Sequence, residues 1–197
     1  ANTTWRITGP DKGDVDGWFA FQNVENLRGG TGADTFAFTD NGVLTGQADG
    51  GAGQDVLDYS AYGTPLNLIL TGEGSVDGYQ GTEENTLPNG FDNMNGVVGT
   101  ASVDMLTASA GDNTWHLTGQ NQGVLNDRFT FRSVENLRGN TGTDTFDFDD
   151  GAGVDGTIDG QGGGDTLDYS TYTTPVYVDL RETSGQASGT AMGISNI

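Results

Sequence analysis

Short runs in which apolar residues alternate with polar or small residues recur along the whole chain. A period of two is typical of strands that are buried on one face. Clusters of Gly, Asp and Asn, which favour turns, separate these runs. No stretch of about 12 residues keeps a helical apolar stripe free of glycine, so we expect an all-β chain with almost no helix. The pattern predicts strands at residues 35–38, 56–59, 66–70, 115–117, 129–131 and 176–180.

The same pattern returns at an offset of 110 residues. Residues 5–70 align with residues 115–180 without a gap, and many of the aligned positions are identical. Self-similarity of this kind indicates a repeat architecture. We therefore divide the chain into a first repeat, residues 1–110, and a second, C-terminally incomplete repeat, residues 111–197.

The two repeats differ in length beyond the aligned part. Residues 90–94 match residues 193–197 at an offset of 103 instead of 110, so the first repeat holds seven more residues. These residues fall in a polar stretch with Glu83 and Glu84, which we expect to be a surface loop. Because Ile197 lies inside a further copy of a short recurring unit, we interpret the sequence as an excerpt of a longer array.

A repeat built from short strands predicts a particular all-β architecture. Strands of successive rungs stack about 4.8 Å apart and bury a continuous core. The spacing of the strands corresponds to rungs of about 20 residues. We therefore expect a parallel β-solenoid of the β-helix or β-roll type.

The composition is strongly acidic and rich in glycine. The 197 residues include 34 glycines and no cysteine, and 28 acidic residues against 7 basic ones give a formal net charge of −21. This charge argues against a nucleic-acid partner, which needs Lys and Arg for its phosphate contacts. The lack of cysteine excludes disulfides and thiolate zinc sites. Since no apolar run reaches about 18 residues, we expect no membrane insertion either.

One motif carries candidate chemistry. Residues 29–37 and 50–58 both match the nonapeptide Gly-Gly-x-Gly-x-Asp-x-U-x, where U is a large apolar residue. Residues 139–147 and 160–168 match it except at the second glycine. Two eroded copies, residues 99–116, keep Asp104 and Asn113 at the aspartate position.

The motif suits a hard cation. Glycines let a loop adopt positive φ and turn its carbonyl groups toward one point, and the Asp adds carboxylate oxygens. Ca²⁺ takes six to eight oxygen ligands at about 2.3–2.6 Å in flexible geometry. One loop supplies too few ligands. The spacing of 21 residues between Asp34 and Asp55, and between Asp144 and Asp165, places two loops one above the other.

These nonapeptides resemble those of the RTX family of secreted calcium-binding repeat proteins. That resemblance implies a parallel β-roll with Ca²⁺ between stacked loops, and an extracellular location. The chain departs from the family because its nonapeptides do not follow one another directly. More loosely, the repeat of 110 residues resembles the tandem modules of large bacterial surface and adhesin-like proteins. The calcium ligands that the resemblance implies lie at Gly30, Gly32, Asp34, Gly51, Gly53, Asp55, Gly142, Asp144, Gly163 and Asp165.

Alternative interpretations remain open for several of these residues. The glycine-rich loops could be turns of a metal-free β-helix. Asp58 and Asp168 could cap a turn or complete a metal shell. Arg28 and Arg138 are expected to pair with a carboxylate such as that of Glu25 or Glu135. An interior stack or a sugar-binding ladder would explain Tyr59, Tyr62, Tyr169 and Tyr172.

Catalysis has little support in the sequence. His116, the single histidine, alternates with apolar residues and is expected to face solvent. Asp149 and Asp150 are expected to lie in a solvated turn, although paired carboxylates also occur in polysaccharide-cleaving enzymes. An ice-binding solenoid would show ladders of Thr-x-Thr, which are absent.

The expected function is therefore structural. We expect a non-enzymatic module, folded and stiffened by Ca²⁺, in a secreted bacterial surface, adhesin or matrix protein. Open strand edges at the ends of a solenoid favour end-to-end stacking into filaments. A glycan or cell-surface partner is also possible in this setting. The alternative function is a carbohydrate-binding or polysaccharide-modifying β-helix module.

Overall fold

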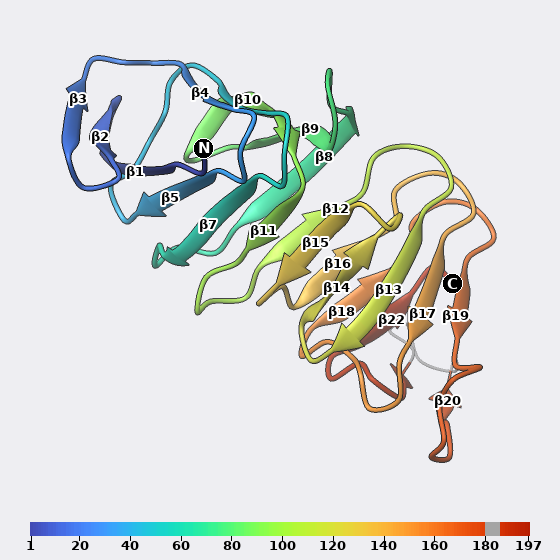
Figure 1. Ribbon diagram of the computed structural model, residues 1–197. Coiled ribbons are helices and arrows are strands. Elements are labelled where there is room, and N and C mark those ends of the chain that lie inside the picture. Colours follow the sequence, from blue (N-terminus) through green and yellow to red (C-terminus); the bar gives the residue numbers. More distant parts are fainter. Residues whose placement is uncertain (180–185) are drawn as a thin grey trace. The chain divides into compact units, whose positions relative to one another are not determined.

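A computed structural model describes residues 1–179 and 186–197, and in these residues it contains 22 strands and no helix (Figure 1). The prediction of an all-β chain with almost no helix is therefore confirmed. Leu180, the last residue of the strand predicted at 176–180, lies outside the described residues. Each of the other five predicted runs coincides with a strand.

The chain divides into two compact units, Ala1–Ser102 and Val103–Ile197. The boundary lies before the repeat boundary inferred at residue 110. Strand β12 (Met105–Thr107) explains the difference, because it pairs in parallel with β16 (Asn136–Arg138) of the second unit. A contact boundary therefore follows strand pairing rather than the sequence repeat.

The first sheet of unit 1 combines parallel and antiparallel pairing. Strands β1, β5, β7 and β11 pair in parallel, and β1, β2 and β3 form an antiparallel meander. The parallel register places Trp5, Phe36, Leu57 and Val97 in one row across the sheet. The strands of this sheet are β1 (Thr4–Gly9), β2 (Lys12–Val15), β3 (Phe19–Gln22), β5 (Thr35–Thr39), β7 (Val56–Ala61) and β11 (Gly96–Val98).

The second sheet of unit 1 has the order β8-β9-β10-β6-β4. Strands β4, β6 and β10 are parallel, whereas β8, β9 and β10 are antiparallel. Leu27, Ala48 and Phe91 are buried in one row, and Figure 1 shows β4 and β10 above the layer of β1, β5 and β7. The strands of this sheet are β4 (Leu27–Gly30), β6 (Ala48–Gly51), β8 (Asn67–Glu73), β9 (Tyr79–Glu83) and β10 (Leu87–Met94).

The expected surface loop around Glu83 is wrong. Glu83 ends strand β9 and is fully buried, whereas Glu84 is exposed. Its Oε2 accepts hydrogen bonds from the backbone N–H and the hydroxyl of Thr86, both at 2.8 Å. The Thr86 hydroxyl lies 2.7 Å from the Tyr59 hydroxyl. A buried carboxylate is tolerated here because local donors satisfy it.

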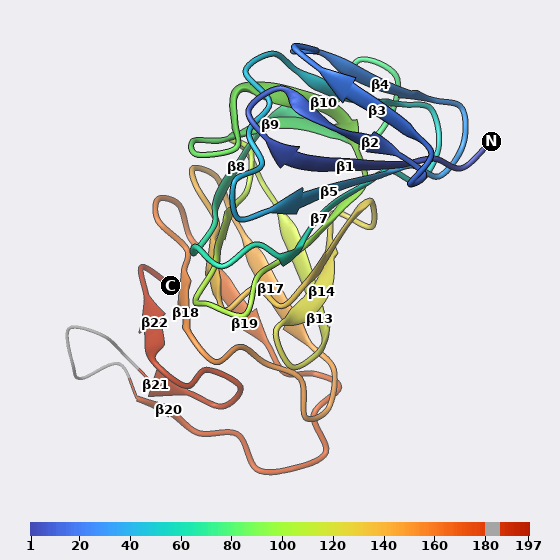
Figure 2. The same cartoon turned by 90° about the vertical axis from the view of Figure 1, so that its left-hand side faces the viewer.

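Unit 2 repeats this plan with shorter strands (Figure 2). Within the unit, one sheet has the order β19-β17-β13-β14-β15 and the other β22-β18-β16-β12, and β20 pairs with β21. The remaining strands are β13 (Thr114–Gly119), β14 (Gln122–Leu125), β15 (Phe129–Arg132), β17 (Thr145–Phe148), β18 (Thr157–Asp159), β19 (Thr166–Asp168), β20 (Val178–Asp179), β21 (Gln186–Ala187) and β22 (Gly193–Ser195).

Aromatic rings fill the core of both units. Trp115 stacks on Phe146 with ring centroids 5.8 Å apart, and Phe148 stacks on Tyr169 at 4.7 Å. Tyr59 stacks in the same way on Phe38 at 4.8 Å. The tyrosines therefore form interior stacks, as the alternation around them predicts, and not an exposed ladder.

The sheets are mixed and do not form a clear parallel solenoid. Antiparallel strands follow β1 in unit 1 and β13 in unit 2 at equivalent positions. Tight turns with positive φ at Asp11, Asp16 and Gly17 make the first of these meanders possible. Asp, Asn and Gly are the residues that such turns accept. These turn signals were missed when the chain was assigned to parallel rungs throughout.

Candidate functional site

The glycine-rich loops of unit 1 lie directly one above the other. Gly30 is in register with Gly51, and the N–H of Ala52 donates to the carbonyl oxygen of Gly30 at 2.8 Å. A Cβ added to Gly53 would lie 2.0 Å from the carbonyl oxygen of Gly32. Only glycine permits such a close approach of two backbones. The 21-residue spacing thus brings the two motifs together as expected.

The loops of unit 2 stack in the same manner. A Cβ added to Gly163 would lie 1.5 Å from the carbonyl oxygen of Gly142. Asn140 and Gln161, which replace the second glycine of each motif, keep positive φ values of 87° and 71°. The two imperfect motifs therefore retain the loop conformation despite the substitutions.

The aspartates of unit 1 form a ladder of hydrogen bonds between rungs. Asp34 and Asp55 are both buried. Oδ1 of Asp34 accepts the N–H of Thr3 at 2.7 Å, and Oδ1 of Asp55 accepts the N–H of Asp34 at 2.8 Å. The N–H of Asp55 in turn donates to Oδ1 of Asn95 at 2.9 Å. One oxygen of each carboxylate thus binds the backbone of a neighbouring rung.

A second ladder runs through unit 2. The N–H of Asn113 donates to Oδ1 of Asp144 at 2.9 Å, and the N–H of Asp144 donates to Oδ1 of Asp165 at 2.8 Å. Asp144 and Asn113 are buried, whereas Asp165 is partly exposed. The eroded motif copy therefore contributes a ladder residue, Asn113, at its aspartate position.

The other carboxylate oxygens have no hydrogen-bond partner. Oδ2 of Asp34, Asp55 and Asp144 is buried, and none of the described residues donates a hydrogen bond to it. A Cβ at Gly29 would lie 2.3 Å from Oδ2 of Asp34 and 2.6 Å from the carbonyl oxygen of Gly50. The unpartnered oxygen thus lies beside a carbonyl oxygen of the next rung. Two convergent oxygens without donors are suited to a cation.

The same pairing of oxygens recurs one rung further. A Cβ at Gly50 would lie 2.6 Å from Oδ2 of Asp55 and 2.4 Å from the carbonyl oxygen of Asn93. Asn93 stands outside the nonapeptides, so motif matching missed it. Its equivalents in the short recurring unit all have positive φ, and this shared conformation is visible at Asn23, Asn93, Ser133 and Asn196.

Burial perturbs the acids of both ladders. Burial raises the pKa of Asp55 to about 6, and the nearby charges of Asp34, Asp77 and Asp49 raise it further against the hydrogen bond from the Asp34 backbone. Burial likewise raises the pKa of Asp144, although hydrogen bonds from Asn113 oppose the shift. A bound cation would favour the charged carboxylates and reverse this direction.

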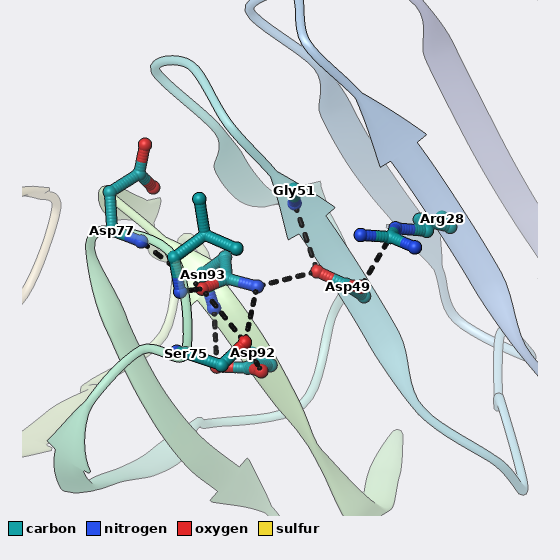
Figure 3. Close-up of polar contacts among 8 residues, drawn as sticks. Arg28, Asp49, Gly51, Ser75, Asp77, Asp92 and Asn93 are labelled. Atoms are coloured by element: carbon teal, nitrogen blue, oxygen red, sulfur yellow. Dashed lines mark hydrogen bonds and ion pairs between the residues drawn. The ribbon is translucent and has the colours of Figure 1, made fainter.

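A turn found only in unit 1 adds polar groups beside this ladder (Figure 3). Oδ2 of Asp77 accepts the N–H of Gly53 at 3.1 Å, and its Oδ1 is buried without a hydrogen bond from the described residues. The turn is held by buried Asn93, whose Oδ1 accepts the N–H of Val76 at 2.7 Å. Nδ2 of Asn93 donates to Asp49 at 2.7 Å.

The arginines pair with carboxylates other than the expected ones. Arg28 lies 3.1 Å from Asp49, and Arg138 lies 3.7 Å from Asp159. Both aspartates occupy the adjacent parallel strand in direct register with the arginine. The proposed partners, Glu25 and Glu135, were chosen by closeness in sequence, whereas sheet register decides the pairing.

The remaining candidates have ordinary structural environments. Oδ1 of Asp58 accepts the N–H of Ser60 at 2.9 Å, and Oδ1 of Asp168 accepts the N–H of Ser170 at 2.8 Å, so both cap turns. His116 is partly exposed and lies 3.1 Å from Asp149. A small pocket of about 90 Å³ in unit 2 is lined by residues that include Arg138.

The geometry offers paired oxygens but not a complete metal centre. Among residues 1–179 and 186–197, no three or more His, Cys, Asp or Glu side chains lie close enough together to hold a metal ion. Any cation would therefore depend on backbone carbonyl groups, as the nonapeptide logic expects. No helix in this part of the chain is long and apolar enough to cross a membrane.

Comparison with known proteins adds no relative. No protein-family model, curated protein or solved structure matches the chain.

Proposed function

We propose that the chain is a non-enzymatic, calcium-stabilised structural module of a secreted bacterial surface, adhesin or extracellular-matrix protein. The observation that carries this proposal is the set of three buried carboxylates, Asp34, Asp55 and Asp144, whose Oδ2 atoms lack a hydrogen bond from the described residues. A buried anionic oxygen without a donor is costly, and a cation is the partner that removes this cost.

The residues present fit a calcium ion by their chemistry. Carboxylate and carbonyl oxygens are the ligands that Ca²⁺ prefers. Asp34 and Gly50 would hold one ion, and Asp55 and Asn93 another, with further oxygens from the stacked loops. When bound, Ca²⁺ would supply positive charge among 28 acidic residues that otherwise repel one another.

The proposed shape is that of a solenoid interrupted by hairpins. Support comes from the parallel ladders, in which Phe36 pairs with Leu57 and Phe146 pairs with Leu167 at an offset of 21 residues. Stacked rungs resist bending because each strand is hydrogen-bonded to its neighbours. Such a module would act as a stiff spacer outside the cell, where calcium is abundant.

Removal of calcium tests this proposal. We expect the purified protein to contain bound Ca²⁺, and excess EGTA to lower its melting temperature in circular dichroism by about 5–10 °C or more. One site saturated at 100 times its Kd contributes about 2.7 kcal/mol, and each kcal/mol shifts the melting temperature by about 2–4 °C for a chain of this size. An unchanged melting curve in EGTA, with no metal found by mass spectrometry, would contradict the proposal.

End-to-end association is the second part of the proposal. The supporting feature is the edge strand β3, where Trp18 is 93% exposed and Phe19 is 68% exposed. Exposed aromatic side chains on a strand edge are a common contact surface. An interface of this kind joins different surfaces of two molecules and therefore produces open filaments.

Phe19→Asp is expected to weaken this association. A charge at Phe19 removes apolar contact area and opposes edge pairing, so light scattering should show a lower mass than for the wild-type chain at the same concentration. Val76→Asp is the matched control, because Val76 is also exposed, at 57%, but lies in the β8–β9 turn. A wild-type chain that is monomeric at high concentration in Ca²⁺ would argue against filaments.

A carbohydrate-binding or polysaccharide-modifying module is the alternative. The pocket near Arg138, Asp159 and Ser195 favours it, because charged and hydroxyl groups can bind sugar hydroxyls. The interior position of Tyr59 and Tyr62 counts against it, since sugars stack on exposed rings. Binding on a glycan array, lost in Arg138→Ala, would favour this alternative over a purely structural role.

A further inference from the structure

Strand β7 of unit 1 shows how an outer strand is covered in this fold. Strand β11 pairs with it in parallel and places Val97 opposite Leu57. Asn95, which precedes β11, accepts the N–H of Asp55 with its Oδ1 at 2.9 Å and donates its own N–H to the carbonyl oxygen of Asp55 at 2.7 Å. Beneath this cover, Leu57 and Tyr59 are fully buried.

Strand β19 of unit 2 has the same sequence but no such cover within that unit. It repeats the Leu-Asp-Tyr-Ser run of β7 and pairs with β17, beyond which it is the last strand of its sheet (Figure 1). Leu167 and Tyr169 are only partly buried, although their equivalents Leu57 and Tyr59 are inaccessible. The edge therefore leaves apolar surface exposed.

The backbone of β19 also presents hydrogen-bonding groups at this edge. The N–H of Thr166 donates to the carbonyl oxygen of Asp144 at 2.8 Å, so Thr166 faces β17. Successive residues of a strand point their N–H and C=O groups to opposite sides. The N–H and C=O groups of Leu167 therefore point toward the open edge, as those of Leu57 point toward β11.

The end of β22 is oriented as the segment before β11 is. Asn196 has a φ of 50° and its equivalent Asn93 a φ of 58°. Nδ2 of Asn196 donates to Asp159 at 2.7 Å, just as Nδ2 of Asn93 donates to Asp49 at 2.7 Å. Both turns thus hold the backbone in the same direction relative to their sheets.

We propose that the open edge of β19 is an acceptor for one added parallel strand with a sequence of the Asn-Gly-Val-Val type. The Asn side chain would accept the N–H of Asp165, and the first Val would cover Leu167, as Asn95 and Val97 do for β7. Strand addition to an open sheet edge is a general mode of recognition, with affinity from backbone hydrogen bonds and specificity from alternate side chains. This proposal deepens the end-to-end association proposed above and rests on it only for its use in an assembly.

The test extends the full chain. Asn-Gly-Val-Val-Gly, copied from residues 95–99, is added directly after Ile197, and Asn-Gly-Ser-Ser-Gly serves as the control of equal length. We expect the first extension to raise the melting temperature by about 4 °C or more and to slow hydrogen exchange at the Leu167 amide by about tenfold or more. The control should change neither value, because serine covers little apolar surface.

Two comparisons separate this proposal from the others. Both extensions are measured in EGTA and in Ca²⁺, and a gain in EGTA supports the acceptor edge even if calcium binding fails. Light scattering of the unextended chain reports association independently of the extension. Equal melting temperatures and equal Leu167 exchange rates for the two extended chains would overturn the proposal.

Discussion

Asp55→Asn is expected to change stability in opposite directions with and without calcium. In excess Ca²⁺ the variant should lose one site and melt about 5–10 °C below the wild-type chain. In EGTA at pH 7.5 it should melt a few degrees above the wild-type chain, because a buried charge has been removed. The two melting temperatures are measured by circular dichroism in matched buffers.

The reason for the opposite signs lies in the two carboxylate oxygens. Asparagine keeps an Oδ1 that can accept the N–H of Asp34, so the ladder between rungs is preserved. It replaces the unpartnered Oδ2 with an amide that can donate toward the nearby carbonyl oxygen of Asn93. The substitution therefore removes a cation ligand and satisfies the metal-free site in one step.

The pKa of Asp55 adds a second signature. Because burial raises this pKa to about 6 in the folded chain, the protonated carboxyl is favoured by folding. Its stabilising contribution is complete below the unfolded pKa of about 3.9 and is lost as pH rises through the folded value. The advantage of Asn in EGTA should consequently be larger at pH 7.5 than at pH 5.

Asp58→Asn is the matched control for this experiment. Asp58 lies three residues further on, and its Oδ1 caps the turn at Ser60. It should show the same difference between Ca²⁺ and EGTA as the wild-type chain. An equal loss in both buffers for Asp55→Asn would mean that the carboxylate acts only through the ladder, and the metal-free interpretation of the loops would then be preferred.

The sequence predicts the parallel part of the fold well because that part depends on one spacing. A period of two places Phe36 and Leu57 inward, and the 21-residue offset between the motifs sets their register. The same offset separates Arg28 from Asp49, so the ion pair was available from the repeat itself. It was missed because partners were sought among near neighbours in sequence.

The antiparallel parts were harder to predict because their signals are local and weak. The turn at Asp16 and Gly17 is two residues long and is easily taken for one of many Gly-Asp clusters. Glu83 appeared to mark a loop because buried carboxylates are rare, and only the donors of Thr86 make its burial tolerable. Such long-range compensation cannot be deduced from residue type alone.

Alanine at Gly53 is expected to be far more damaging than alanine at Gly30. Both glycines have positive φ, 145° at Gly53 and 121° at Gly30, so either substitution carries backbone strain of about 1–3 kcal/mol. At Gly53 the new Cβ would also lie 2.0 Å from the carbonyl oxygen of Gly32, whereas at Gly30 it would meet nothing within 4 Å. The two variants therefore separate strain from loss of loop stacking.

Unit 2 contains natural counterparts of both substitutions. Asn140 occupies the position of Gly30 with a φ of 87°, so a side chain is accommodated there. Gly163 occupies the position of Gly53, and a Cβ there would lie 1.5 Å from the carbonyl oxygen of Gly142. The glycine is thus retained where the backbones of the two loops touch and is replaced where space is open.

The expected result is a fall in melting temperature of roughly 10 °C or more for Gly53→Ala and of a few degrees for Gly30→Ala, since overpacking adds about 1–3 kcal/mol to the strain. Gly53→Ala should also reduce the calcium-dependent part of the stability, because separating the loops moves the Asp34 and Asp55 oxygens apart. Gly30→Ala should leave that part nearly intact. If both variants melted at the same temperature, close stacking of the two glycine-rich loops would not be what stabilises the ladder.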